Sequence, residues 1–199
     1  MSTTTTDRVL AEAFGPSDGT ILRIKQATLV VLGIVLLTVA AKISIPMWPV
    51  PVTMGTFAVL TVGAAYGPRL GLATILGYMI IGALGFDVFA GSTAEAYGLT
   101  YMMGGTGGYL VGYVLATLAL GMLARRGWDK SIGWMALALV IGNALIYIPG
   151  LLWLGQLFGW DKPILEWGFT PFLIGDALKL VLAALIVPGV WKLVGKART

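Results

Sequence analysis

The chain has 199 residues, of which 58% are hydrophobic and only 11% are charged, and it contains neither His nor Cys. This composition is typical of an integral membrane protein and excludes an ordinary soluble domain. Without His and Cys, the chain cannot form disulfides, thiol nucleophiles or zinc sites built on those residues, and it lacks the commonest general base. The sequence therefore favours a binding protein over an enzyme and predicts no metal and no cofactor.

The first 20 residues are polar and show no apolar period, with a run of four Thr at residues 3–6. Such a segment cannot bury enough apolar surface to order itself. We therefore expect residues 1–20 to be a disordered cytoplasmic tail and residues 21–199 to form a single membrane domain.

Six apolar stretches follow, and a bilayer crossing takes about 20 such residues. The expected crossings lie near residues 21–41, 53–66, 69–84, 105–124, 132–154 and 171–191. The second and third are short and meet at Gly67-Pro68, where Gly can end one helix in a left-handed turn and Pro can begin the next. The sequence thus predicts an all-α fold of six transmembrane helices, with a tight helical hairpin at Gly67.

The distribution of Lys and Arg predicts the orientation, because positive charge favours the cytoplasmic side. With both termini inside, ten Lys and Arg lie on the cytoplasmic side, against Lys42 and Lys162 outside. This topology accounts for the formal charge of +4, so nucleic-acid binding is not expected.

The first outer loop, residues 43–53, carries Pro46, Pro49 and Pro51 around Trp48. Three prolines in six positions favour stiff, extended backbone. The loop is interpreted either as a rigid connector with Trp48 as an interfacial anchor, or as a lid over a pocket that opens outward, with Trp48 as a candidate ligand contact.

The third outer loop, residues 85–109, is too rich in glycine for a stable helix and too apolar for a free loop. Non-helical backbone at membrane depth is tolerated where it lines a cavity, so we expect this loop to form a pocket wall. Its candidate ligand contacts are Gly91, Ser92 and Tyr97. Gly104, Gly108 and Gly112 recur every four residues, which predicts close packing of another helix.

The last two crossings carry the polar candidates. Asn143 and Tyr147 share a helix face, where they either line the pocket or hydrogen-bond between helices. Asp176 and Lys179 share another face, and Asp176 lies about six residues, or roughly 9 Å, into its span. Each charge costs about 2.5 to 3.5 kcal/mol in hydrocarbon unless it is paired or hydrated. The pair is therefore either a ligand-binding site or an internal salt bridge.

Four segments together resemble the BioY family, the biotin-binding subunits of energy-coupling-factor (ECF) vitamin transporters. They are Ile43-Ser44-Ile45-Pro46 with Pro49-Val50-Pro51-Val52-Thr53; Gly67-Pro68-Arg69-Leu70-Gly71; Phe89-Ala90-Gly91 with Gly104-Gly105-Thr106-Gly107-Gly108-Tyr109; and Gly175-Asp176 with Lys179. The resemblance covers residues 24–190. It implies six helices that enclose one biotin near the outer surface, with Asp176 accepting from a ureido N–H and Lys179 donating to a ligand oxygen.

The resemblance also implies the partners and the location. Besides biotin and membrane lipid, these would be a transmembrane coupling subunit and cytoplasmic ATPase subunits, in a bacterial cytoplasmic (inner) membrane. The coupling subunit would dock on small residues of the first helix.

Several positions depart from the family pattern. Gly55 stands where Gln is frequent, Asp87 and Gly105 stand where Pro is usual, and Ile174 replaces a Pro. Glu95 is a candidate substitute for an Asn that some members carry in the third outer loop.

Other functions remain open from the residues alone. A proton-coupled carrier of biotin or another small vitamin would use Asp176 as its protonation site. An intramembrane enzyme would use Asp176 or Glu95 as acid or base, although the chain offers no nucleophile beside a base. A purely structural helix bundle would bind no small molecule.

Overall fold

The computed structural model describes residues 8–15, 18–91 and 96–196, and it is predominantly helical. The α-helices are α1 Leu10–Ala13, α2 Gly19–Lys42, α3 Gly55–Ala83, α4 Gly98–Met102, α5 Gly107–Arg125, α6 Ile132–Phe158, α7 Ile164–Gly168 and α8 Leu173–Lys196. Two short strands, β1 Ser44–Ile45 and β2 Val52–Thr53, and two 3₁₀ turns, η1 Trp128–Lys130 and η2 Thr170–Phe172, complete the elements.

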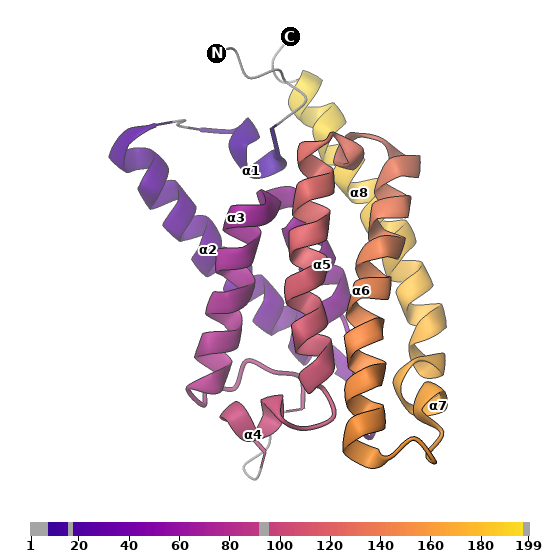
Figure 1. Ribbon diagram of the computed structural model, residues 1–199. Coiled ribbons are helices and arrows are strands. Elements are labelled where there is room, and N and C mark those ends of the chain that lie inside the picture. The colour runs from indigo at the N-terminus through magenta and orange to yellow at the C-terminus, as the bar shows by residue number, and fades with distance from the viewer. Residues whose placement is uncertain (1–7, 16–17, 92–95, 197–199) are drawn as a thin grey trace.

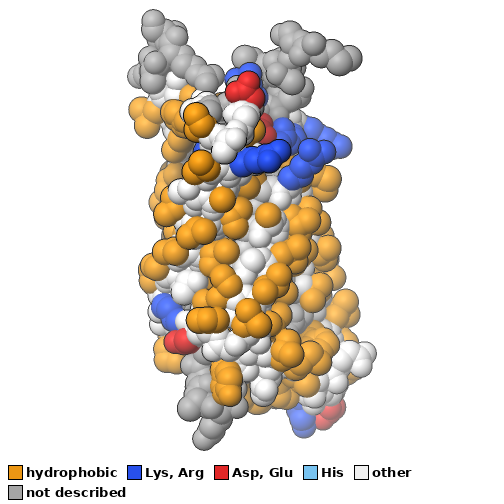
Figure 2. Space-filling model, turned by 90° about the vertical axis from the view of Figure 1, so that its left-hand side faces the viewer, with side chains coloured by type: hydrophobic (Ala, Val, Ile, Leu, Met, Phe, Trp, Pro, Cys, Tyr) orange, Lys and Arg blue, Asp and Glu red, His pale blue; other side chains and the backbone are white. Residues whose placement is uncertain are grey.

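Within the described ranges, five helical segments are long and apolar enough to cross a membrane. They are Gly19–Lys42, Gly55–Ala83, Gly107–Arg125, Ile132–Phe158 and Ile164–Val194. In Figure 2 hydrophobic side chains cover the middle of the visible face, while Lys, Arg, Asp and Glu gather toward the two ends. The chain is therefore a multi-pass membrane protein.

One of these five segments, α3, reverses direction within its length. Gly67 has φ 75° and ψ 178°, and Pro68 follows it. A Cβ added to Gly71 would lie 3.6 Å from the Cα of Gly63, although residues eight apart on a straight helix are separated by about 12 Å. The left-handed glycine turn expected at this position is present, and the two halves of α3 pack against each other.

Glycines bring the backbones of α5 and α6 into contact. A Cβ on Gly112 would lie 2.6 Å from the Cα of Ile146, and one on Gly108 would lie 2.9 Å from the Cα of Gly150. No side chain fits at either position without moving α6. The packing role predicted for Gly108 and Gly112 is confirmed, whereas Gly104 lies beside backbone of its own loop.

The short helices lie at opposite ends of the bundle of long helices (Figure 1). At one end lie α1, the bend of α3 and the last turns of α8; at the opposite end lie α4 and α7. Strands β1 and β2 pair antiparallel, with Ser44 opposite Thr53 and Ile45 opposite Val52, so that residues 43–53 fold back as a hairpin.

Part of the predicted tail differs from expectation. Residues 10–13 form α1, and Val9 and Ala13 are buried. A Cβ on Gly67 would lie 3.2 Å from the Val9 side chain, so the glycine turn of α3 leaves the space in which Val9 packs. The expected disorder of residues 1–7, 16 and 17 concerns positions outside the described residues.

Candidate ligand-binding site

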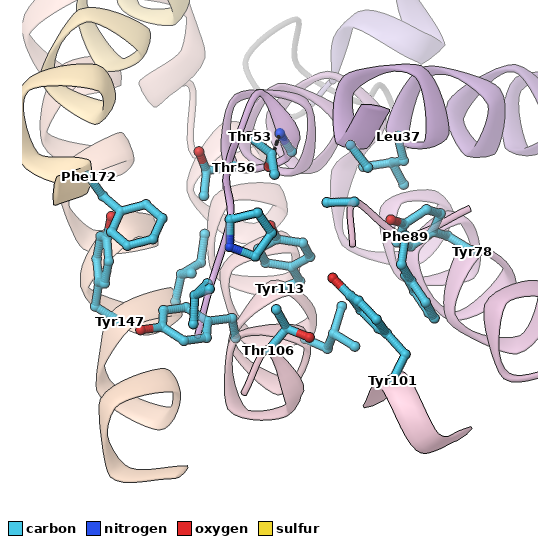
Figure 3. Close-up of a pocket in the computed structure, with 18 of the residues that line it drawn as sticks. Leu37, Thr53, Thr56, Tyr78, Phe89, Tyr101, Thr106, Tyr113, Tyr147 and Phe172 are labelled. Carbon is cyan, nitrogen blue, oxygen red and sulfur yellow. Dashed lines mark hydrogen bonds between the residues drawn. The ribbon is translucent and has the colours of Figure 1, made fainter. Parts of the chain in front are cut away.

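A cavity lies between the helices, toward the end of the bundle that carries α4 and α7. The space inside it together with the solvent at its mouth is about 670 Å³. The wall is formed by apolar and aromatic side chains with a few polar groups (Figure 3). The lining residues are Leu37, Ala41, Val50, Pro51, Thr53, Gly55, Thr56, Tyr78, Phe89, Ala90, Tyr101, Thr106, Tyr109, Leu110, Tyr113, Ile146, Tyr147, Phe172 and Lys179.

Lys179 is the cationic group of this wall, and Asp176 lies directly behind it. Lys179 Nζ donates to Asp176 Oδ1 at 2.8 Å, to the carbonyl oxygen of Thr53 at 2.6 Å and to Thr56 Oγ1 at 3.2 Å. The side chains of Asp176 and Lys179 are only 6% and 11% exposed. The pair therefore connects α8 to the segment that enters α3, in surroundings where an unpaired charge would be costly.

Tyr147 completes this polar cluster from α6. Its hydroxyl donates to Asp176 Oδ2 at 2.5 Å, and Thr56 Oγ1 donates to Asp176 Oδ1 at 3.3 Å. Asp176 thus receives three hydrogen bonds from three different elements.

Tyrosines from α5 form the adjoining wall. Tyr109 and Tyr113 lie one turn apart and share a face of the helix. The hydroxyl of Tyr109 donates to the carbonyl oxygen of Gly168 at 2.8 Å, which fixes α7 beside the cavity. The rings of Tyr109 and Tyr147 meet edge to face with centroids 6.1 Å apart.

An aromatic stack closes the opposite side. Phe89 and Tyr101 stack with centroids 4.9 Å apart, and Tyr78 meets Phe89 edge to face at 5.3 Å. The Tyr101 hydroxyl points into the cavity in Figure 3. Lys42 holds this segment by an ion pair with Asp87 and a 2.7 Å hydrogen bond to the carbonyl oxygen of Phe89. Aromatic faces on both sides leave a slot suited to a flat, largely apolar ligand.

Three of the candidates named from the sequence come together in one cluster, in which Lys179 and Tyr147 line the cavity and Asp176 lies behind them. Asn143 is buried on α6 but does not line the cavity, and its Oδ1 has no hydrogen-bond partner among the described residues. The helix face that it shares with Tyr147 thus continues past the cavity, away from the end of the bundle that carries α7.

The loop candidates lie farther out. Trp48 is 67% exposed and packs edge to face on Phe158 and Trp167, so it anchors the hairpin to α6 and α7 without lining the cavity. Tyr97 is 55% exposed, and neither it nor Gly91 lines the cavity. Ser92 lies outside the described residues, as does Glu95.

Sequence reasoning did not single out most of the aromatic wall. The i, i+4 repeat of Tyr109 and Tyr113 was the signal available, because it places two hydroxyl-bearing rings on one face of a transmembrane helix. Phe89 and Tyr101 gave no such signal, since they lie in irregular segments and meet only through tertiary packing.

The positions that depart from the family pattern have local explanations. A Cβ on Gly55 would lie 2.8 Å from Thr53 Oγ1 and 3.1 Å from the Tyr113 hydroxyl, so those two groups occupy the space of a longer side chain. A Cβ on Gly105 would lie 2.8 Å from the carbonyl oxygen of Pro49, which brings the hairpin against the third loop. Ile174 is 80% exposed on the outer surface of α8 and points away from the site.

The cluster offers hydrogen bonds and a fixed charge pair to a ligand. Within the described ranges no group of three or more acidic side chains is arranged to hold a metal ion. The cluster pairs a carboxylate with a cation and two hydroxyls, which is an arrangement for orienting a polar ligand.

Known proteins resemble this chain in sequence and in fold. The BioY family model matches residues 11–196. The probable biotin transporter BioY of Pyrococcus horikoshii is 36% identical over 83% of this chain and 95% of that relative. The biotin transporter BioY of Thermotoga maritima is 36% identical over 76% of this chain and 86% of that relative. The crystal structure of the S-component for biotin from an ECF-type ABC transporter superposes with a TM-score of 0.73 at 21% identity, covering 88% of this chain and 95% of that one, and supports the fold. The chain therefore belongs to the BioY family.

Proposed function

We propose that this chain is the substrate-binding subunit of an ECF-type transporter and that it captures biotin for uptake across the membrane. The observation that carries the proposal is the buried Asp176–Lys179 pair at the wall of an aromatic cavity. Its relatives' names point to the same ligand.

The chemistry of biotin suits the cavity. Biotin has two ureido N–H donors, a ureido carbonyl acceptor, an apolar bicyclic ring and a carboxylate on a flexible chain. The stacked Phe89 and Tyr101 on one side and Tyr109 on the other offer surfaces for the ring system. Lys179 and Asp176 offer the donor and the acceptor that the ureido group needs.

Binding then proceeds by an exchange of hydrogen bonds. An ammonium group has three N–H donors, and Lys179 already directs them at Asp176, Thr53 and Thr56. The contact to Thr56, at 3.2 Å, is the longest of the three and the one that a ligand oxygen replaces. Asp176 accepts three hydrogen bonds where a carboxylate can accept about four, so it retains one acceptor position for a ligand N–H.

The finer topology is part of the same proposal. Because α3 doubles back at Gly67, its halves count as two short crossings, which with α2, α5, α6 and α8 make six. An even number leaves α1 and the end of α8 on one side, as Figure 1 draws them, and the excess of Lys and Arg there favours the cytoplasm. The cavity then faces outward, and the membrane is the bacterial inner membrane.

Energy for uptake has to come from partners, because the sequence contains no phosphate-binding Gly-Lys-Ser/Thr loop. We propose a transmembrane coupling subunit and two cytoplasmic ATPases. Of the small residues expected on the docking face, Gly33, Ala40 and Ala41 are buried inside this chain, while Ala27 is exposed. The exposed apolar face of α2, which includes Val31, Val35 and Val39, fits a membrane-embedded partner better.

Equilibrium binding of labelled biotin to the purified chain in detergent, without ATP or partners, tests the proposal. We expect one biotin per chain, and no comparable binding of an unrelated vitamin. Well-folded protein that binds no biotin would contradict the proposal.

A proton-coupled carrier is the alternative, and the buried, titratable Asp176 is the feature that favours it. Uptake into vesicles that hold only this chain separates the two. Transport abolished by a protonophore would support the carrier, whereas binding without transport until ATPase subunits are added supports the binding subunit.

A further inference from the structure

A second cavity lies at the opposite end of the bundle, beside α1. The space inside it together with the solvent at its mouth is about 1560 Å³. Its lining residues are Arg8, Ala11, Glu12, Gly15, Leu22, Lys25, Gln26, Leu29, Tyr66, Arg69, Leu70, Ala73 and Arg125. Four of these are cationic and one is acidic, so the lining has a net formal charge of +3.

The cavity exists because α2 diverges from the rest of the bundle. Gly33 contacts α3 closely, since a Cβ there would lie 3.1 Å from the Tyr66 ring. Every residue from Gly19 to Leu32 is at least partly exposed, whereas the buried residues of α2 are Gly33 and positions beyond it. In Figure 1 this half of α2 leans away from α3, with α1 across the gap. The cavity therefore opens sideways between helices that cross the bilayer.

Its cations are only partly neutralised. Arg125 pairs with Glu12, and Lys25 donates to the carbonyl oxygen of Phe14. Arg8 and Arg69 are exposed and form no ion pair with any residue in the described ranges. Figure 2 shows Lys and Arg side chains gathered at the same end of the molecule.

The remaining lining adds apolar side chains between the cations. Leu22, Leu29 and Leu70 lie among the charged residues of the lining. A lining of basic and apolar side chains, open to the side of a membrane helix, matches a lipid whose phosphate lies at the interface and whose chains run along the protein.

We propose that this cavity binds the phosphate headgroup of an anionic phospholipid, with Arg8 and Arg69 as the principal contacts. The proposal concerns the end of the bundle remote from Asp176 and does not depend on biotin binding. Each basic side chain near an anionic membrane surface contributes about fivefold to affinity. Loss of both arginines should therefore weaken lipid binding by at least about tenfold.

The experiment compares Arg8→Gln/Arg69→Gln with Arg23→Gln/Arg126→Gln, which removes two exposed cations that do not line the cavity. Native mass spectrometry of the purified full chain counts retained phosphatidylglycerol, and titration with phosphatidylglycerol or phosphatidylcholine in detergent gives the affinity. We expect the unmodified chain and the control to retain and prefer phosphatidylglycerol, and the first variant to lose both properties. Arg8→Lys/Arg69→Lys should restore binding.

Three results would overturn the proposal. An equal loss of affinity for phosphatidylglycerol in the two double variants would show that general surface charge, and not this cavity, attracts the lipid. Saturation by inorganic phosphate, with no preference for phosphatidylglycerol, would identify a site for a free anion. Unchanged lipid binding, together with weaker assembly of the first variant with transporter partners, would make the cavity a protein interface. A thermal unfolding curve in detergent that matches that of the unmodified chain serves as the check on folding in each variant.

Discussion

The Asp176–Lys179 pair permits a test that separates a ligand-binding role from a purely structural one. The test uses Asp176→Asn, Lys179→Met and the double variant, which form a double-mutant cycle. Both side chains are almost fully buried, at 6% and 11% exposed, so solvent screens the remaining charge in a single variant only weakly. Removing one partner of such a pair costs about 3 to 5 kcal/mol, and removing both costs much less.

Stability and biotin affinity should therefore follow different patterns among the three variants. Thermal unfolding in detergent should show both single variants strongly destabilised and the double variant closer to the unmodified chain. Biotin affinity should behave differently, because a hydrogen bond to a charged group contributes about 1.5 to 3 kcal/mol. All three variants should bind biotin at least about tenfold more weakly, since the double variant regains stability but not the polar contacts.

An exposed ion pair on the same side of the bundle as the cavity supplies the control. Lys162 lies 3.0 Å from Asp161, and the two side chains are 49% and 73% exposed. Exposed pairs contribute little, so Asp161→Asn/Lys162→Met should change neither property. A double variant at Asp176 and Lys179 that binds biotin within about twofold of the unmodified chain would refute the site assignment and leave the pair an internal salt bridge.

Three further expectations follow from other contacts. Tyr147→Phe should weaken biotin binding by about 1.5 kcal/mol in the same binding assay, because it removes the 2.5 Å hydrogen bond to Asp176; unchanged affinity would contradict this. Gly108→Ala should lower stability by about 1 to 3 kcal/mol by overpacking against α6, whereas Gly133→Ala, where a Cβ meets nothing within 4 Å, should not, as thermal unfolding can show. Burial raises the pKa of Asp129 from 3.8 to about 6, so the folded chain retains a proton that the unfolded chain loses, and stability should fall on the order of 2 to 3 kcal/mol as pH rises through that window. Denaturation against pH should lose this dependence in Asp129→Asn.

The sequence predicted the long apolar helices well because their signal is local. An expected crossing at 105–124 became α5 at Gly107–Arg125, and the turn at Gly67 has the positive φ that Gly-Pro suggested. Hydrophobic length and glycine conformation are properties of a few consecutive residues. Neither depends on what packs around them.

The cavity wall and α1 depend on residues far apart in the chain, and the sequence did not reveal them. Val9 is buried only because the turn at Gly67 leaves room for it, and a four-residue helix carries no periodicity to detect. Tyr113 enters the site because its hydroxyl lies where a side chain at Gly55 would be. Contacts of this kind, between residues far apart in the chain, cannot be predicted from either residue alone.

The structural and functional interpretations of Asp176 and Lys179 are compatible, and together they imply selectivity. In the described structure the pair is satisfied internally, by Thr53, Thr56 and Tyr147. On the proposed binding mode a ligand displaces Thr56 and has to offer Lys179 an oxygen in return. A ligand of similar shape without that oxygen leaves a buried N–H unpaired, which costs about 1 to 3 kcal/mol or more for a charged group. On the proposed binding mode, the cluster thereby discriminates against ligands that fill the slot but lack the ureido carbonyl.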